Sequence, residues 1–222
     1  MAEEEPIARS PIAPARPELV AAGWAVSGRR SGAALRITDC MPLAKVAVKA
    51  PLGGTMAHGL GVRFGRSARQ RWEIGEGEAV VLVVASGPGD WLVLGPPRTQ
   101  DGLRSALYDT AAVADELVSV IDLTHGRALM RLTGEKSRDL LAKECGVDLA
   151  DETCPDGAAL RSAVSGVATD LIRDDVDRGD RAPTTSYLLH CERSSGQYLF
   201  DSLLDAGAEL GVDIDGYVPP GL

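Results

Sequence analysis

The sequence predicts an α+β fold in which antiparallel sheets are backed by helices. β-branched and alternating apolar stretches indicate strands, for example in Glu78–Val84 and in Val118–Leu123. Apolar residues at helical spacing follow each group of strands, and Gly- and Pro-containing turns separate the elements. After residue 32 the order is several strands and a helix, then strand-strand-helix, then strand-strand-helix. This order is typical of split β-α-β architecture.

The composition favours a soluble globular protein and excludes several classes of function. The 222 residues are 45% hydrophobic and 25% charged, with a formal net charge of −9. A polyanion such as nucleic acid is therefore not expected as a partner, because phosphate binding needs a basic face. Four scattered cysteines without a C-x-x-C pair predict reduced thiols and no disulfide framework or zinc site. With no signal segment or membrane-spanning run, we expect a cytoplasmic protein.

Residues 1–32 are predicted to form an extended N-terminal arm. Four prolines between Pro6 and Pro17 oppose regular pairing, and Glu18–Ala25 is the one segment expected to be structured, as a short helix. The arm is either disordered or laid across another chain, with Trp24 as its anchor. Residues 33–222 are then one domain with two sub-lobes, roughly 33–117 and 118–222.

In the first sub-lobe, Ala34–Thr38 and Ala44–Val48 are predicted strands joined by a turn at residues 39–42. Ala50–Arg71 is interpreted as a surface loop with a basic rim. Glu78–Val84 and Trp91–Leu94 flank the turn Gly87-Pro88-Gly89-Asp90 and predict a hairpin. Thr99–Val113 has helical spacing, and Asp101 favours its N-terminus.

The second sub-lobe opens with the unit around which the chain is organised, VSVIDLTHGRALMRLTGEKSRDLL (118–141). It predicts a strand, a turn at 124–126, a second strand over 127–132 and a helix capped by Thr133. Further on, 158–163 is a short helix or turn, and 164–173 and 184–191 are strands. They are separated by the polar loop 174–181. Ser194–Leu210 is an amphipathic helix, for which Tyr198, Leu199, Leu203 and Ala206 form the apolar face, and the tail 217–220 is irregular.

The histidines are the first candidates for chemistry. Asp122 stands three residues before His125 and could orient it as a base, but no paired nucleophile is visible, so a local turn histidine is favoured. His58 is expected to be exposed. His190 and Cys191 cannot share a metal, because adjacent strand residues face opposite sides of the sheet.

The other candidate motifs have structural interpretations. The glycines at 59, 61 and 65 miss the dinucleotide-binding fingerprint by one residue and lack a helix afterwards. Asp174, Asp175, Asp177 and Asp180 lack the spacing of a calcium loop, which favours a solvated hairpin tip. Trp72 and Trp91 are predicted to be core or interface residues. The residues therefore assign no catalytic, cofactor-binding or metal-binding position.

A resemblance adds to this interpretation. The DLTH turn at 122–125, the following RALMRLTG strand and the helix after it resemble the aminomethyltransferase (glycine-cleavage T-protein) superfamily. LRITDCMPLAKVAV, GPGDWLVLGPP, the LTG…LLAK string, SYLLHCERSSGQYLFDSLLDAG and the N-terminal ARSP resemble the gamma subunit of heterotetrameric sarcosine oxidase. The matching pieces cover most of the chain from Leu35 onward.

The resemblance implies a T-protein-like fold and a non-catalytic role in assembly and stabilisation of a complex that oxidises sarcosine to glycine. It implies alpha, beta and delta subunits as partners, and FAD, FMN, NAD, tetrahydrofolate and zinc bound by those subunits and none by this chain. The Gly/Arg-rich segment 50–71 and the long Asp-rich loop depart from the family pattern. They leave open a relative acting on dimethylglycine or another N-methyl amine.

Two other functions stay open at this point. One is a stand-alone folate-binding one-carbon module, for which Asp122 is the candidate to hold the pterin. The other is a small flavin- or nucleotide-dependent enzyme that uses the Gly-rich loop.

Overall fold

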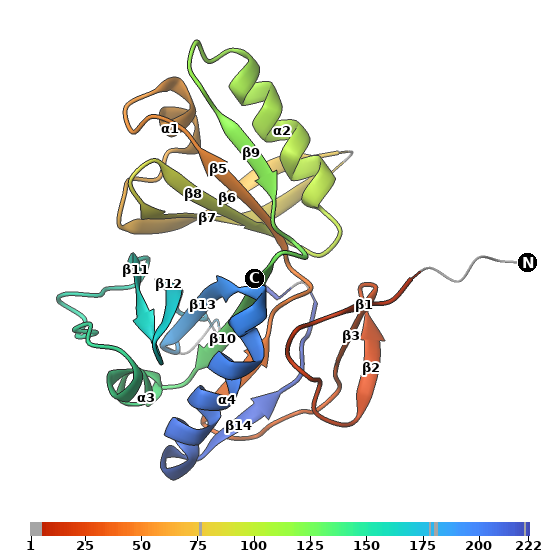
Figure 1. The fold of residues 1–222 in the computed structure, drawn as a ribbon, viewed down its shortest axis with the longest axis vertical. Coiled ribbons are helices and arrows are strands. Elements are labelled where there is room, and N and C mark those ends of the chain that lie inside the picture. Colours follow the sequence, from red (N-terminus) through yellow and green to blue (C-terminus); the bar gives the residue numbers. More distant parts are fainter. Residues whose placement is uncertain (1–5, 76, 178, 180–181, 220) are drawn as a thin grey trace, which may run out of the picture.

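The computed structural model describes residues 6–75, 77–177, 179, 182–219 and 221–222. Within these ranges it contains three sheets and four α-helices (Figure 1). The α+β prediction is confirmed. No helix in the described part of the chain is long and apolar enough to cross a membrane.

In each of the three sheets the spatial order of neighbouring strands differs from their order in the chain. A three-stranded sheet contains β1 (Ala8–Arg9), β3 (Trp24–Ser27) and β2 (Glu18–Ala21). A five-stranded sheet contains β6 (Arg66–Ile74), β7 (Gly77–Gly87), β8 (Asp90–Gly95), β5 (Ala44–Lys49) and β9 (Ser119–Asp122). A six-stranded sheet contains β11 (Ala159–Val164), β12 (Val167–Arg173), β13 (Ser186–Glu192), β10 (Arg127–Thr133), β4 (Leu35–Asp39) and β14 (Val212–Asp215).

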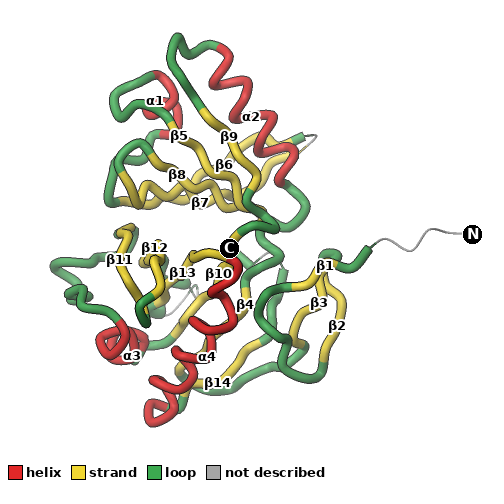
Figure 2. The backbone as a smooth tube through the Cα atoms, viewed as in Figure 1, coloured by secondary structure: helices red, strands yellow, loops and turns green. Residues whose placement is uncertain are grey.

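The two large sheets pack face to face and are covered by helices on their outer faces (Figure 2). Helices α1 (Thr55–Leu60) and α2 (Gln100–Ala112) cover the five-stranded sheet through Met56, Leu60, Leu103 and Leu107. Helices α3 (Ser137–Glu144) and α4 (Gly196–Gly207) cover the six-stranded sheet. Short 3-10 turns, Arg193–Ser195 and Ala208–Leu210, flank α4.

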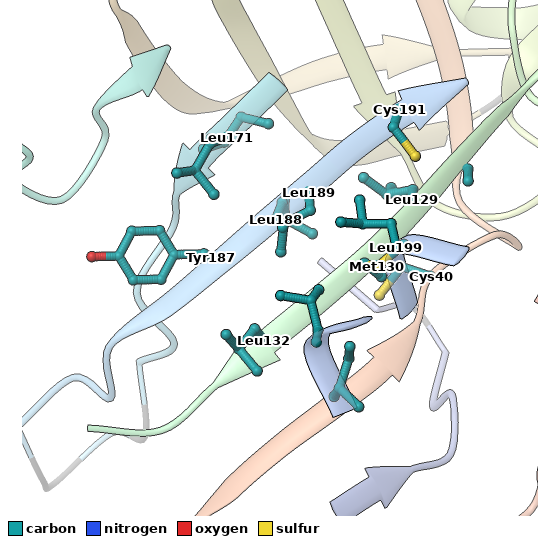
Figure 3. Close-up of a cluster of buried hydrophobic side chains, with 14 of the residues drawn as sticks. Cys40, Leu129, Met130, Leu132, Leu171, Tyr187, Leu188, Leu189, Cys191 and Leu199 are labelled. Atoms are coloured by element: carbon teal, nitrogen blue, oxygen red, sulfur yellow. The ribbon is translucent and has the colours of Figure 1, made fainter. Parts of the chain in front are cut away.

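The alternation of residues along the strands creates two separate cores. On β10 and β13, the paired residues Ala128 and Cys191, Met130 and Leu189, and Leu132 and Tyr187 share one face. Gly196 of α4 lies against Ala128, so this face is the helix-covered one. Figure 3 shows buried side chains from both faces of these strands. Leu129 and Leu188 face the other sheet, where Leu82, Val84, Leu92 and Leu94 complete the inter-sheet core.

The chain crosses between the two large sheets twice, which the sequence did not indicate. β4 and β5 were expected to be joined by a simple turn, and so were β9 and β10, but the members of each pair lie in different sheets. The crossings are tied together, since Thr124 Oγ1 accepts a hydrogen bond from the Lys45 amide at 3.1 Å. The five-stranded sheet therefore takes its strands from between residues 44 and 122, and the six-stranded sheet takes its strands from 35–39 and from between 127 and 215.

The N-terminal segment differs from the predicted irregular arm. Residues 18–25 form no helix, because Ala22 and Gly23 adopt positive φ angles of 53° and 82° and turn the chain into the antiparallel β2–β3 hairpin. Ile12, Trp24 and Val26 are buried in the main core of this same chain. The prolines precede the hairpin and leave its pairing intact.

Four further predictions of local structure are wrong. The expected loop 50–71 contains α1 and the start of β6, and the expected helix or turn at 158–163 is strand β11. Thr133 ends β10 and caps nothing; instead Ser137 Oγ donates to the Gly134 carbonyl at 2.6 Å. Tyr198 was expected on the buried face of α4 but lies on the exposed face, and Phe200 is buried instead. The β7–β8 hairpin, α2, α3, β13 and most of α4 are confirmed.

Candidate functional site

A pocket of about 360 Å³ opens between the two large sheets at the end where β5, β8, β12 and β13 meet. Trp91, Leu92, Ile121 and Leu123 form an apolar wall. The remaining lining includes charged and polar side chains from both sheets, namely Lys49, Ser86, Asp90, Arg127, Arg161, Thr169, Asp170, His190 and Glu192. An apolar cleft with a few convergent polar groups is the usual form of a small-molecule site.

Asp170 is the centre of the polar cluster. One of its oxygens, Oδ2, lies 2.9 Å from His190 Nδ1. The other, Oδ1, accepts hydrogen bonds from Ser86 Oγ at 2.7 Å and from Arg161 Nε at 2.8 Å. Three donors on one buried carboxylate stabilise its charged form.

The cluster continues toward the pocket mouth through Asp90. Arg161 Nη1 lies 3.2 Å from Asp90 Oδ2, and Lys49 Nζ lies 3.1 Å from Asp90 Oδ1. Lys49 and Arg161 both retain substantial exposure, so each has further N–H groups available at the rim. The rim is therefore cationic and the interior holds the carboxylate–imidazole pair.

The protonation states of His190 and Asp170 follow from their surroundings. Burial opposes ionisation of Asp170, but the hydrogen bonds from His190, Arg161 and Ser86 outweigh it and hold the pKa of that carboxyl well below its usual range. Burial lowers the pKa of His190 despite the neighbouring carboxylate. A neutral imidazole beside an ionised carboxylate places its proton on Nδ1, which donates to Asp170.

The other ring nitrogen of His190 is left as an acceptor. Only 3% of the residue is exposed, and Nε2 is a buried atom without a hydrogen-bond partner in the structure. A carboxylate that orients an imidazole is an arrangement found in general acid–base sites, but Nε2 is enclosed by the protein in this structure. Within the described residues no hydroxyl or thiol is bonded to Nε2, so the structure provides no nucleophile for the pair.

His125, for which the sequence favoured a local turn role over that of a base, does not line the pocket. His125 is exposed and stacks on Trp24, with ring centroids 4.7 Å apart and ring planes at 13°. Asp122 Oδ1 accepts from the Thr124 amide at 2.8 Å and so closes the turn, and no bond joins Asp122 to His125. His58 is exposed as expected and faces the Gly54 carbonyl at 2.7 Å.

The Asp-rich loop is less solvated than expected. Asp174 is buried and binds Arg131 and Arg69, and Asp175 binds Arg173. Asp177 is exposed, and Asp180 lies outside the described residues. The described residues contain no group of three or more His, Cys, Asp or Glu side chains that could hold a metal ion.

The remaining candidates have structural roles. The Gly59–Gly65 string ends α1, with Gly61 at a φ of 67° after the helix, and connects it to β6. Trp91 is buried and donates to the Val62 carbonyl at 2.9 Å, while Trp72 packs against the outer core of the five-stranded sheet. All four cysteines are free thiols.

Sequence reasoning missed Ser86, Asp90, Arg161 and Asp170. One signal was present, because Asp170 interrupts the otherwise apolar centre of Val167–Arg173 and a charge in a buried strand needs a partner. His190 occupies an equivalent position in β13, directly paired with Asp170. Their meeting depends on strand register, which a single sequence does not reveal.

No protein-family model matches the sequence, and neither does any curated protein sequence. Solved structures do share its fold. A chain of heterotetrameric sarcosine oxidase from Corynebacterium sp. U-96, in complex with pyrrole 2-carboxylate, superposes with a TM-score of 0.59 at 20% identity. The alignment covers 83% of this chain and 89% of that one, so the two chains are of similar length.

The second solved structure is the glycine cleavage system aminomethyltransferase T from Bartonella henselae, with a TM-score of 0.67 at 15% identity. The alignment covers 90% of this chain but 55% of the aminomethyltransferase, so the chain spans about half the length of that protein. The predicted T-protein-like fold is therefore confirmed at the level of the overall architecture. The chain has a fold that is also found in a sarcosine oxidase subunit and in an aminomethyltransferase.

Proposed function

We propose that this chain is a non-catalytic, gamma-type subunit of a flavin-dependent sarcosine oxidase complex, acting in its assembly and stabilisation. The observation that carries the proposal is the fold shared over nearly the full length of both this chain and a sarcosine oxidase chain. The alpha, beta and delta subunits are the partners, and they hold FAD, FMN, NAD, tetrahydrofolate and zinc. The N-methyl amine oxidised by the complex is sarcosine or a relative such as dimethylglycine.

Exposed apolar side chains at one end of the molecule support a role in assembly. Leu52, Val113 and Leu117 lie on the connections before α1 and after α2, and Leu117 is 86% exposed. Glu116 joins these connections, since its carboxylate accepts from the amides of Thr55 and Met56 at 3.1 and 2.9 Å. Exposed apolar side chains on two connections that a hydrogen-bonded carboxylate links are suited to an interface.

The test is affinity purification of the tagged full chain from its native host. We expect larger chains to copurify, with a flavin absorbance spectrum and formation of hydrogen peroxide from sarcosine, while the isolated chain is colourless and inactive. We also expect Leu117→Lys to reduce copurification without changing the urea-unfolding midpoint. Val20→Lys, at an exposed apolar position on β2, is the control and should change neither copurification nor the midpoint. A chain that purifies alone, with no flavoprotein attached, would show the proposal to be wrong.

The fold of the aminomethyltransferase favours a second candidate, a folate-binding one-carbon module acting alone. Asp122, the pterin ligand suggested by the sequence, does not line the pocket, and its Oδ1 closes the turn before His125. Asp90, Asp170 and Glu192 are the carboxylates that line the pocket. Saturable binding of tetrahydrofolate to the isolated chain, weakened by Asp90→Asn, would favour this candidate over the assembly role.

A further inference from the structure

The outer edge of β6 has backbone groups that no neighbouring strand uses. β6 ends the five-stranded sheet and pairs with β7 on one side only. At its start the outer side is occupied, because the Ser67 amide donates to the Gly157 carbonyl at 2.7 Å. Successive amides of a strand point to opposite sides, so those of Arg69, Arg71 and Glu73 also point outward. Within the described residues no group beyond the sheet bonds to these three amides. Such an edge is a template for a further strand.

The same edge carries positive charge that the chain leaves largely unpaired. Four exposed arginines lie on it or directly before it, namely Arg63, Arg66, Arg69 and Arg71. Among the described residues, only Arg69 has a carboxylate partner, which is Asp174. Arg66 reaches the Asp156 carbonyl at 3.3 Å. In a chain with a formal net charge of −9, this is a local surplus of cations that suits a negatively charged partner.

The two faces of the edge differ in chemistry. Arg69 and Arg71 lie on the face toward the six-stranded sheet, where Arg69 binds Asp174, and Trp72 lies on the helix-covered face. Trp72 is half-buried and fixed in place, because its Nε1 donates to Gln70 Oε1 and Gln70 Nε2 donates to the Leu60 carbonyl, both at 2.8 Å. A pocket of about 360 Å³ lies beside Trp72, between α1 and α2. An added strand would therefore meet cations on one face and apolar surface on the other.

A second copy of β6 does not fit this edge. Antiparallel pairing of two copies about Gln70 would set Arg69 of one copy opposite Arg71 of the other. Like charges directly opposite one another destabilise a strand pair, whereas opposite charges stabilise it. The occupant that complements the edge is a strand with acidic side chains at these positions.

We propose that the free edge of β6 binds an extended segment of a partner protein in which acidic residues alternate with apolar ones. The backbone of the segment pairs with the outward amides and carbonyls of β6. Its acidic side chains meet Arg69 and Arg71, and its apolar side chains lie beside Trp72. In strand addition of this kind, main-chain hydrogen bonds give affinity and alternate side chains give specificity. The proposal does not depend on the sarcosine oxidase assignment, because it concerns only the chemistry of the bound segment.

The test titrates the full chain with the end-blocked peptide Glu-Val-Glu-Val-Glu-Val-Glu. We expect saturable binding that slows hydrogen exchange at the amides of Arg69, Arg71 and Glu73. Tryptophan emission should change through Trp72, since Trp24 and Trp91 are buried. The peptide with Lys in place of Glu, and the one with Pro in place of the central Val, should bind far more weakly. Equal binding of the Pro peptide, or no protection of the three amides, would overturn the proposal and leave the arginines as charges that keep the edge from self-association.

Variants separate recognition from folding. Arg71→Glu changes an exposed side chain and should weaken peptide binding about tenfold at low salt without moving the urea-unfolding midpoint. Glu73→Pro keeps every arginine and removes one outward N–H, a change that an edge strand tolerates, and should also weaken binding, whereas Glu73→Ala should not. Lys136→Glu, an exposed position directly before α3 on the other sheet, is the control for the change of charge and should bind normally.

The control decides between a site and a general effect of charge. Equal losses of affinity in Arg71→Glu and Lys136→Glu would refute the site, because net charge and not the β6 edge would then determine binding. The outcome is distinct from a failure of the proposed function, since the peptide assay uses the isolated chain and no flavoprotein.

Discussion

Removal of the negative charge of Asp174 is expected to destabilise the fold strongly. Its carboxylate accepts hydrogen bonds from Arg131 Nη2 at 2.7 Å and from Arg69 Nη2 at 2.8 Å. The side chains of Asp174 and Arg131 are 4% and 10% exposed, so Asp174→Asn leaves a buried guanidinium without its counter-charge. Breaking one side of a buried ion pair costs about 3–5 kcal/mol.

The structure sets the expected magnitude at the lower end of that range. Arg131 keeps its hydrogen bonds to the Asp174 carbonyl and to Ser186 Oγ, both 3.0 Å, after the substitution. Arg69 is 38% exposed and can turn to water, so its lost pair contributes little. We therefore expect Asp174→Asn to lower the free energy of unfolding by about 3 kcal/mol.

Urea unfolding followed by circular dichroism measures this loss. Glu209→Gln is the control, because Glu209, in the 3-10 turn after α4, pairs with Lys143 of α3 at the surface, and we expect its loss to leave the urea-unfolding midpoint nearly unchanged. The double variant Asp174→Leu/Arg131→Met removes both charges and should be less destabilised than Asp174→Asn. A loss below about 1 kcal/mol for Asp174→Asn would refute the reasoning, because it would mean that the Arg131 guanidinium reaches water or another partner.

Three further predictions concern the core. Burial lowers the pKa of Lys45 to about 7, so between pH 7 and its ordinary pKa the unfolded chain binds more protons than the folded one. Stability should then rise by about 2 kcal/mol from pH 7 to pH 9 relative to Lys45→Met, measured by urea unfolding, and equal pH profiles would contradict this. The Tyr187 hydroxyl is buried without a partner, so Tyr187→Phe should leave the thermal midpoint unchanged or higher. Tyr108→Phe, which loses a 3.2 Å bond to the Val120 carbonyl, should lower it. Trp24→Ala should cost about 3–5 kcal/mol in the same unfolding assay, because Trp24 is buried against His125; a loss below about 1 kcal/mol would show that the N-terminal sheet contributes little.

The last of these predictions reverses an expectation drawn from the sequence. If residues 1–32 were an extended arm, their removal would weaken assembly of a complex more than it destabilises this chain. In the structure, Ile12, Trp24 and Val26 belong to the core that also contains β4 and β10. Truncation of residues 1–30 is therefore expected to expose that core and destabilise the chain itself, whatever it does to a complex.

Turn residues and hydrophobic spacing predicted an element correctly where contacts between residues close in sequence stabilise it. The β7–β8 hairpin is one example, because Gly89 takes the positive φ of 71° that its turn needs. Helix α2 is another, since Leu103 and Leu107 occupy one face at helical spacing. Such elements need no information about distant parts of the chain.

Elements stabilised by distant partners were missed. β14 is a short polar strand, VDID, that exists because it pairs in parallel with β4 about 180 residues earlier. β11 pairs with its neighbour β12 across the Ser165-Gly166 turn, and a distant contact also holds it, because the Ala159 amide donates to the Gly65 carbonyl at 3.0 Å. In both cases tertiary pairing decides the conformation, and the local propensity is weak.

The candidate site is a consequence of how the two sheets pack, which explains why no motif announces it. Leu82, Leu129 and Leu188 fill the centre of the inter-sheet layer with apolar side chains, and the polar residues on the same faces lie toward its ends. At one end, β12 and β13 pair Asp170 with His190, and Ser86 approaches from β7 of the opposite sheet. A shift of β13 by one residue would turn His190 toward α4 and bring Leu189 into the pocket, because side chains alternate along a strand. The Asp170–His190 pair beside the pocket is therefore specified by the register of three strands and by the contact of two sheets.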